Sequence, residues 1–79
     1  MKDDVLDVVR CRAAFHLSLA QIGIRNARRC RAEMNKPGVS SEAWVAHRDA
    51  VLDGIARFKA NRPYWHKYRR AIQWVEARA

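Results

Sequence analysis

The sequence predicts an all-α fold, and three observations support this prediction. The chain of 79 residues contains 3 Gly and 2 Pro, which is too few for the turns that an all-β fold requires. Apolar residues recur at intervals of three and four, the period of an amphipathic helix. One strong break, Asn35-Lys36-Pro37-Gly38, divides the sequence, and a weaker one follows at Asn61-Arg62-Pro63. A chain this short forms a single domain over residues 1–79.

The first expected helix is long and spans about residues 3–35. Asp3, Asp4 and Asp7 place negative charge near its start. Positive charge gathers near its end, before the break at Asn35. Both placements favour the helix dipole, so these charges support the two boundaries.

Two shorter helices are expected after the break, over about residues 41–60 and from residue 63 to the end. Ser40 or Ser41 can cap the second helix, with Glu42 in its first turn. Asn61 can cap the third helix, and Pro63 then lies in a first turn where its missing N–H costs nothing. The sequence therefore predicts a long N-terminal helix packed against two shorter helices.

The first helix carries a wide apolar arc of about 220°, against about 100° for an ordinary surface helix. Two seven-residue spacings run along it, Leu6-Ala13-Ala20-Ala27-Met34 and Val9-His16-Gly23-Cys30. The middle of this seam is small, so the backbone of a partner helix can approach closely. The second helix has an apolar stripe of Trp44, Val51, Ile55 and Phe58, flanked by Val45 and Leu52. The third has an apolar arc of Tyr64, Trp65, Tyr68, Ala71, Ile72, Val75 and Ala79.

Two shorter helices that run back along the first cover one side of its apolar arc. We therefore expect either a compact three-helix bundle or a homodimer that forms a four-helix bundle.

The charge is strongly basic, with a formal net charge of +8 and a pI near 10.5. The segment from Arg57 to Arg70 contains six Lys/Arg and no acid. Lys and Arg along a helix face neutralise phosphates, and an exposed Trp beside Arg stacks on bases. Nucleic-acid binding is therefore our first hypothesis. Its primary site is Lys67, Arg70, Trp74 and Arg78, and its secondary residues are Arg62, Arg69, Arg25, Arg28, Arg29 and Arg31.

A protein partner is the alternative hypothesis. Trp and Arg are enriched in interface hot spots, so the same residues fit docking on an acidic protein surface, as an adaptor or an inhibitor does. Membrane-surface binding by the third helix is disfavoured, because a small chain needs the apolar face of that helix for its core.

Catalysis and metal binding find little support in the sequence. The common catalytic and phosphate-binding motifs are absent, and the His and Cys residues lack the short spacings of zinc sites. We expect a non-enzymatic protein without a cofactor. For His16 we expect that it either fills a gap in the core seam or bonds a polar group facing it. Cys11 and Cys30 are about 28 Å apart on one helix, so we expect free thiols in a cytoplasmic protein. We expect no membrane span, because no apolar stretch approaches 20 residues.

Overall fold

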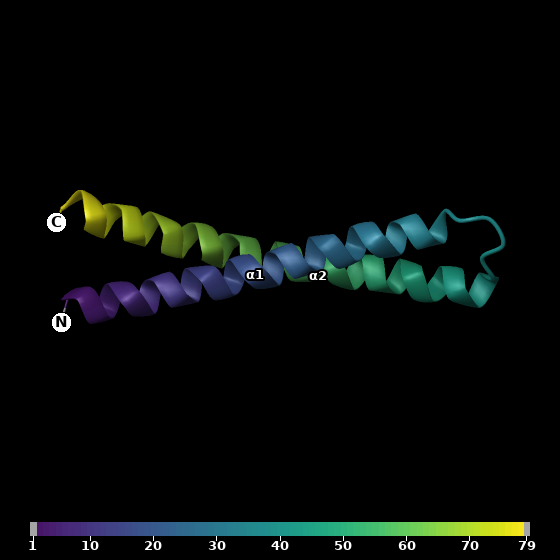
Figure 1. The fold of residues 1–79 in the computed structure, drawn as a ribbon, viewed down its shortest axis with the longest axis horizontal. Coiled ribbons are helices and arrows are strands. Elements are labelled where there is room, and N and C mark those ends of the chain that lie inside the picture. The colour runs from purple at the N-terminus through teal and green to yellow at the C-terminus, as the bar shows by residue number, and fades with distance from the viewer. Residues whose placement is uncertain (1, 79) are drawn as a thin grey trace.

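The structure is an antiparallel hairpin of two long helices, given by a computed structural model that describes residues 2–78 (Figure 1). Within these residues, α1 spans Lys2–Met34 and α2 spans Ser41–Ala77, and there is no strand. The hairpin is a rod with extents of 58 × 17 × 14 Å. Its radius of gyration is 17.6 Å, against about 12 Å for a compact domain of this length. The predicted all-α class is confirmed.

The turn between the helices lies where the sequence predicts it. Gly38 adopts a φ of +77°, a conformation that glycine reaches without steric cost. The Ser40 hydroxyl then accepts a hydrogen bond of 3.1 Å from the N–H of Ala43 and caps α2. The first helix, the break and this cap therefore agree with the prediction.

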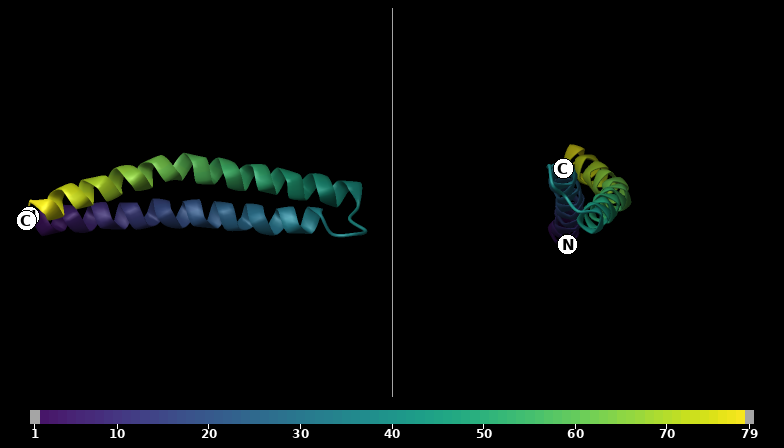
Figure 2. Two further views of the ribbon diagram at one scale, coloured as in Figure 1. Left: turned by 90° about the horizontal axis from the view of Figure 1, so that it is seen from above. Right: turned by 90° about the vertical axis from the view of Figure 1, so that its right-hand side faces the viewer.

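The predicted third helix is wrong, because α2 continues without interruption through Pro63. Asn61 does not cap a new helix: its side-chain amide donates to the Arg57 carbonyl oxygen at 2.8 Å, one turn earlier in the same helix. Proline lacks an N–H and deprives the Lys59 carbonyl of its partner, which bends a helix without necessarily ending it. α2 is bowed in the side view of Figure 2, whereas α1 is nearly straight.

The seam of α1 faces α2 as predicted. All nine residues of its two seven-residue spacings are buried or half-buried. α2 supplies a matching seam with the same alternation of three and four, also buried or half-buried throughout: His47, Val51, Gly54, Phe58, Asn61, Trp65, Tyr68, Ile72 and Val75. Two such seams pack as an antiparallel coiled coil.

The middle of the seam is narrow because its residues are small. Ala13, Ala20 and Ala27 are buried, at 4–7% exposure. Gly23 and Gly54 are buried where the helices cross. A Cβ atom built on Gly23 would lie 2.6 Å from the Gly54 carbonyl oxygen. The predicted close approach of a partner backbone is therefore confirmed.

Polar and aromatic side chains fill the seam toward the chain termini. His16 Nδ1 lies 2.9 Å from the Asn61 side-chain oxygen, so the predicted bond to a facing polar group is confirmed. The imidazole stacks on Tyr64 and Tyr68, with ring centroids 5.0 and 5.7 Å apart. At the open end, Arg10 of α1 joins Glu76 of α2 by an ion pair of 2.9 Å.

Several predicted core residues are exposed instead. The two helices bury one stripe each, so the wide apolar arc of α1 and the flanks of the α2 stripe stay open. Nine large apolar or aromatic residues among the described ones are exposed: Val5, Val8, Phe15, Ile22, Trp44, Val45, Leu52, Tyr64 and Trp74.

Cys11 is exposed and Cys30 is half-buried, both as free thiols. Neither helix is both long and apolar enough to cross a membrane.

Candidate nucleic-acid interface

The crossing of the two helices sorts the chain into two long edges. In Figure 1 each helix starts on the lower edge of the rod and ends on the upper edge. We call the upper edge the basic edge, formed by the second halves of the helices, residues 23–34 and 55–78. We call the lower edge the apolar edge, formed by the first halves, residues 4–22 and 41–54.

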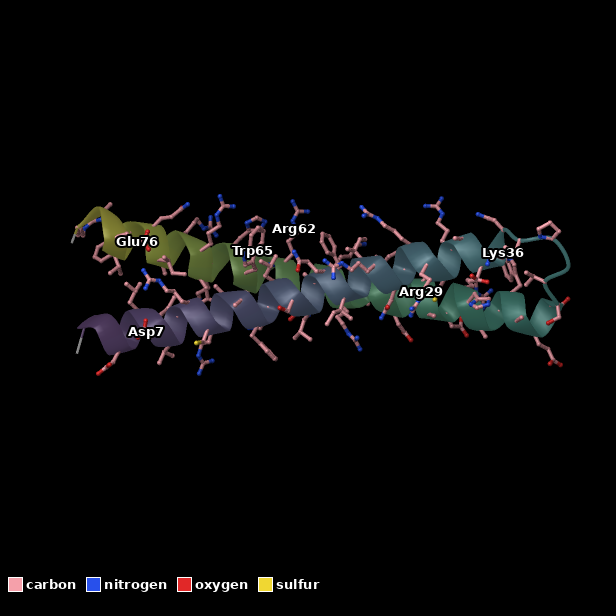
Figure 3. The ribbon with its side chains drawn as sticks, in the orientation of Figure 1. Asp7, Arg29, Lys36, Arg62, Trp65 and Glu76 are labelled. Atoms are coloured by element: carbon pink, nitrogen blue, oxygen red, sulfur yellow. The ribbon has the colours of Figure 1, made fainter. Side chains whose placement is uncertain are left out.

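Charge is distributed unequally between these edges. The basic edge carries eleven Lys/Arg and two Asp/Glu, whereas the apolar edge carries three Lys/Arg and five Asp/Glu. Figure 3 shows nitrogen-tipped side chains along the upper edge of the rod, with Arg62 among them. The half-helices of the basic edge therefore carry a net charge of +9, and those of the apolar edge carry −2.

The cations of the basic edge are free of ion pairs among the described residues. Both acids of this edge are engaged by cations from elsewhere. Lys36 of the turn binds Glu33 at 2.7 Å, and Arg10 of the apolar edge binds Glu76. An incoming anion therefore does not have to displace an internal carboxylate from these eleven side chains.

The predicted primary site lies on the last turns of α2. Lys67, Arg70, Trp74 and Arg78 are all exposed. The Arg78 guanidinium carbon lies 3.8 Å from the centre of the Trp74 ring, and Arg78 also donates to the Trp74 carbonyl oxygen at 3.3 Å. A cation–π contact within the chain therefore covers one face of Trp74, although the side chain is 58% exposed.

The secondary residues of α2 are held by aromatic neighbours. Arg62 lies over the Phe58 ring at 5.7 Å, and Arg69 lies over the Trp65 ring at 5.5 Å. Arg62 Nε also approaches His66 Nε2 at 3.3 Å. The Phe58 and Trp65 rings lie in the seam, so their contacts with Arg62 and Arg69 position the two guanidinium groups at the edge of the hairpin.

The cluster at the end of α1 consists of exposed side chains, Arg25, Arg28, Arg29 and Arg31. The register set by the pairs Gly23–Gly54 and His16–Asn61 places this cluster about 27 Å along the rod from Lys67. The structure therefore does not join the two clusters into one pocket. The two clusters lie on the two half-helices that form the basic edge, and Arg57 and Lys59, which are outside the predicted site, lie on the same half-helices.

An apolar groove of about 540 Å³ opens between the helices beside the primary site. The sequence does not predict this groove, because Val9 and Val75 belong to the apolar faces that are expected to pack together. Leu6, Val9 and Val75 belong to the seven-residue seams of the two helices, and this spacing is the sequence signal that these side chains face one another. Its lining residues are Val5, Leu6, Val9, Ala71, Trp74, Val75 and Arg78.

Among the described residues, His, Cys, Asp and Glu do not gather in groups of three that would suit a metal ion. Within the described residues, the surfaces whose composition suits a binding partner are thus the basic edge and the apolar surfaces beside it.

No protein-family model, curated protein or solved structure matches the chain.

Proposed function

We propose that this protein binds the sugar–phosphate backbone of nucleic acid along its basic edge. The observation that carries the proposal is the concentration of eleven Lys/Arg, none of them in an internal ion pair, on the half-helices that form one edge of a 58 Å rod. Phosphate contacts of this kind are independent of base sequence and dominate non-specific affinity. Lys67, Arg70 and Arg78, with the cluster Arg25–Arg31, neutralise phosphates.

Trp74 adds a stacking surface to this edge. One face of its ring lies under Arg78, and an exposed aromatic group beside cations is typical of single-strand binding. Unpaired bases can therefore stack at the end of α2 while Arg70 and Lys67 hold the adjoining phosphates. This arrangement favours single-stranded over duplex nucleic acid.

The test is a titration of purified protein into labelled 20-nucleotide single strands and duplexes between 50 and 200 mM salt. Contact with about five phosphates predicts a log–log slope near −3.5 for single strands and −4.5 for duplexes. Unrelated base sequences should bind alike. If neither nucleic acid binds at 50 mM salt, the proposal is wrong.

An acidic protein surface is the second candidate partner, and the groove beside Trp74 favours it. A hot spot places Trp or Arg next to an apolar pocket, and Trp74 and Arg78 both line this groove. For such a complex, Trp74→Ala should cost more than about 2 kcal/mol of binding free energy. Recovery from lysate with and without nuclease distinguishes the two partners, because a protein complex survives nuclease.

A further inference from the structure

The apolar edge carries most of the exposed large apolar side chains. Seven of the nine lie on it: Val5, Val8, Phe15, Ile22, Trp44, Val45 and Leu52. Both helices contribute, because their first halves together form the lower edge of the rod from the open end to the turn (Figure 1). We propose that two copies of this chain pack against each other through their apolar edges and form a four-helix bundle.

The exposed area of one hairpin agrees with a dimer. The chain exposes 6160 Å², whereas a compact monomer of 9.2 kDa exposes about 4,900 Å². The excess is about 1,250 Å² per chain, or about 2,500 Å² for two chains. Interfaces of obligate homodimers bury about 2,000–5,000 Å². A dimer interface of this size would therefore bury about the area by which the exposed surface of the hairpin exceeds that of a compact monomer.

The buried core of one hairpin is also small. Among the described residues, the buried apolar side chains are three alanines, and each contributes little burial free energy compared with Leu or Phe. Phe15 is 59% exposed in one hairpin. Pairing of two apolar edges gives Phe15 and its neighbours the second layer that a helical bundle requires.

Charge selects the edge through which two copies meet. A two-fold symmetric contact places the same surface of each copy at the interface. Contact through the basic edges would oppose eleven Lys/Arg with eleven more, whereas the apolar edges carry three cations and five acids each. Self-association through the apolar edge thus avoids like-charge repulsion and leaves both basic edges on the outside of the dimer. A membrane surface or another protein is disfavoured as the partner of the apolar edge. Neither would explain why the excess exposed area of two hairpins matches the area that a homodimer interface buries.

The experiment is sedimentation equilibrium of the full chain between 1 and 200 µM, after nuclease treatment and purification in high salt. These steps prevent nucleic acid from bridging two copies, so the result is independent of the proposed function. We expect a mass of twice 9.2 kDa. A mass of one chain throughout this range would overturn the proposal, including when the monomer binds vesicles or another protein.

Matched variants locate the interface. Phe15→Glu and, separately, Leu52→Glu should raise the dimer dissociation constant at least about 30-fold. Gln73→Glu is the control, because Gln73 is exposed on the basic edge and does not line the groove that Val5 shares with Trp74, and it should leave the dimer intact. Dissociation by Gln73→Glu together with an intact Phe15→Glu dimer would place the interface on the wrong edge and contradict the proposal.

Thiol alkylation gives a second readout that needs no variant. Cys11 is exposed on the apolar edge, whereas Cys30 is half-buried between the helices. Alkylation of Cys11 should slow as the protein concentration rises, and alkylation of Cys30 should stay constant. A Cys11 rate that is independent of concentration would argue against this interface, even where a variant fails to fold.

Discussion

Gly23 of α1 and Gly54 of α2 lie backbone against backbone where the helices cross. A Cβ atom on Gly23 would meet the Gly54 carbonyl oxygen at 2.6 Å and the Phe58 nitrogen at 3.2 Å. Both distances are shorter than van der Waals contact, and the atoms in the way belong to the backbone of α2. The hairpin therefore depends on the absence of side chains at these two positions.

Gly23→Leu should destabilise the hairpin by several kcal/mol, because the new side chain forces the helices apart. The higher helix propensity of Leu offsets less than about 1 kcal/mol of this loss. Urea unfolding followed by circular dichroism measures the change. Ala32→Leu is the control, since it places the same side chain on an exposed position of α1 outside the apolar edge and should be nearly neutral. Equal stability of the two variants would contradict the crossing.

His16 and Asn61 form the polar pair of the seam, joined at 2.9 Å. Replacement of either by Ala removes one hydrogen bond and leaves a half-buried polar group without its partner. Each single variant should lose about 1–2 kcal/mol of unfolding free energy. A double-mutant cycle should give a coupling of about 1 kcal/mol. A coupling near zero would show that stacking on Tyr64 and Tyr68, and not the hydrogen bond, holds His16.

Pro63 interrupts the hydrogen bonding of α2 without ending the helix. Pro63→Ala should restore the bond from residue 63 to the Lys59 carbonyl and remove a helix-interior penalty of about 3 kcal/mol at most. We expect a higher melting temperature and greater helicity. A lower melting temperature would show instead that the bow at this position is needed for α2 to pack on α1.

Glu33 lies in the last turns of α1, where the helix dipole disfavours a negative charge. The hydrogen bond from Lys36 Nζ, and next the charge of Lys36, lower the pKa of Glu33 below its ordinary value of 4.5. The stabilisation from this pair is therefore complete above pH 4.5 and is lost as the pH falls through the lowered pKa. Carboxyl NMR titration should show this midpoint, and Lys36→Met should move it upward. An unchanged midpoint in Lys36→Met would exclude Lys36 as the cause.

The sequence was sufficient to predict the parts of the fold that depend on local chemistry. The bounds of α1, the turn at Gly38, the cap at Ser40 and the seam through Gly23 all follow from nearby residues. The predicted third helix is wrong because Pro63, a residue typical of a helix start, lies inside α2. The seven-residue spacing His47-Gly54-Asn61-Tyr68-Val75 continues past Pro63, and this continuity indicates one helix.

The arrangement of the basic residues could not be predicted in the same way. The two Arg-rich runs are obvious in the sequence, but their common edge depends on where the helices cross. That point is fixed by Gly23 meeting Gly54, a contact between residues 31 positions apart in the chain. Tertiary packing therefore decides that Arg28 and Arg70 lie on one side of the molecule.

Separate substitutions of Arg70 and Arg48 test whether nucleic-acid binding depends on the basic edge or on the total charge of the chain. Both are exposed, but Arg70 lies on the basic edge, whereas Arg48 lies on the apolar edge beside Asp49 at 3.4 Å. Arg70→Gln should lower the magnitude of the salt slope by about one and weaken binding to all base sequences alike. Arg48→Gln removes the same charge and should leave the slope unchanged. Equal effects of the two substitutions would mean that binding follows net charge alone, and the basic edge would then lose its role.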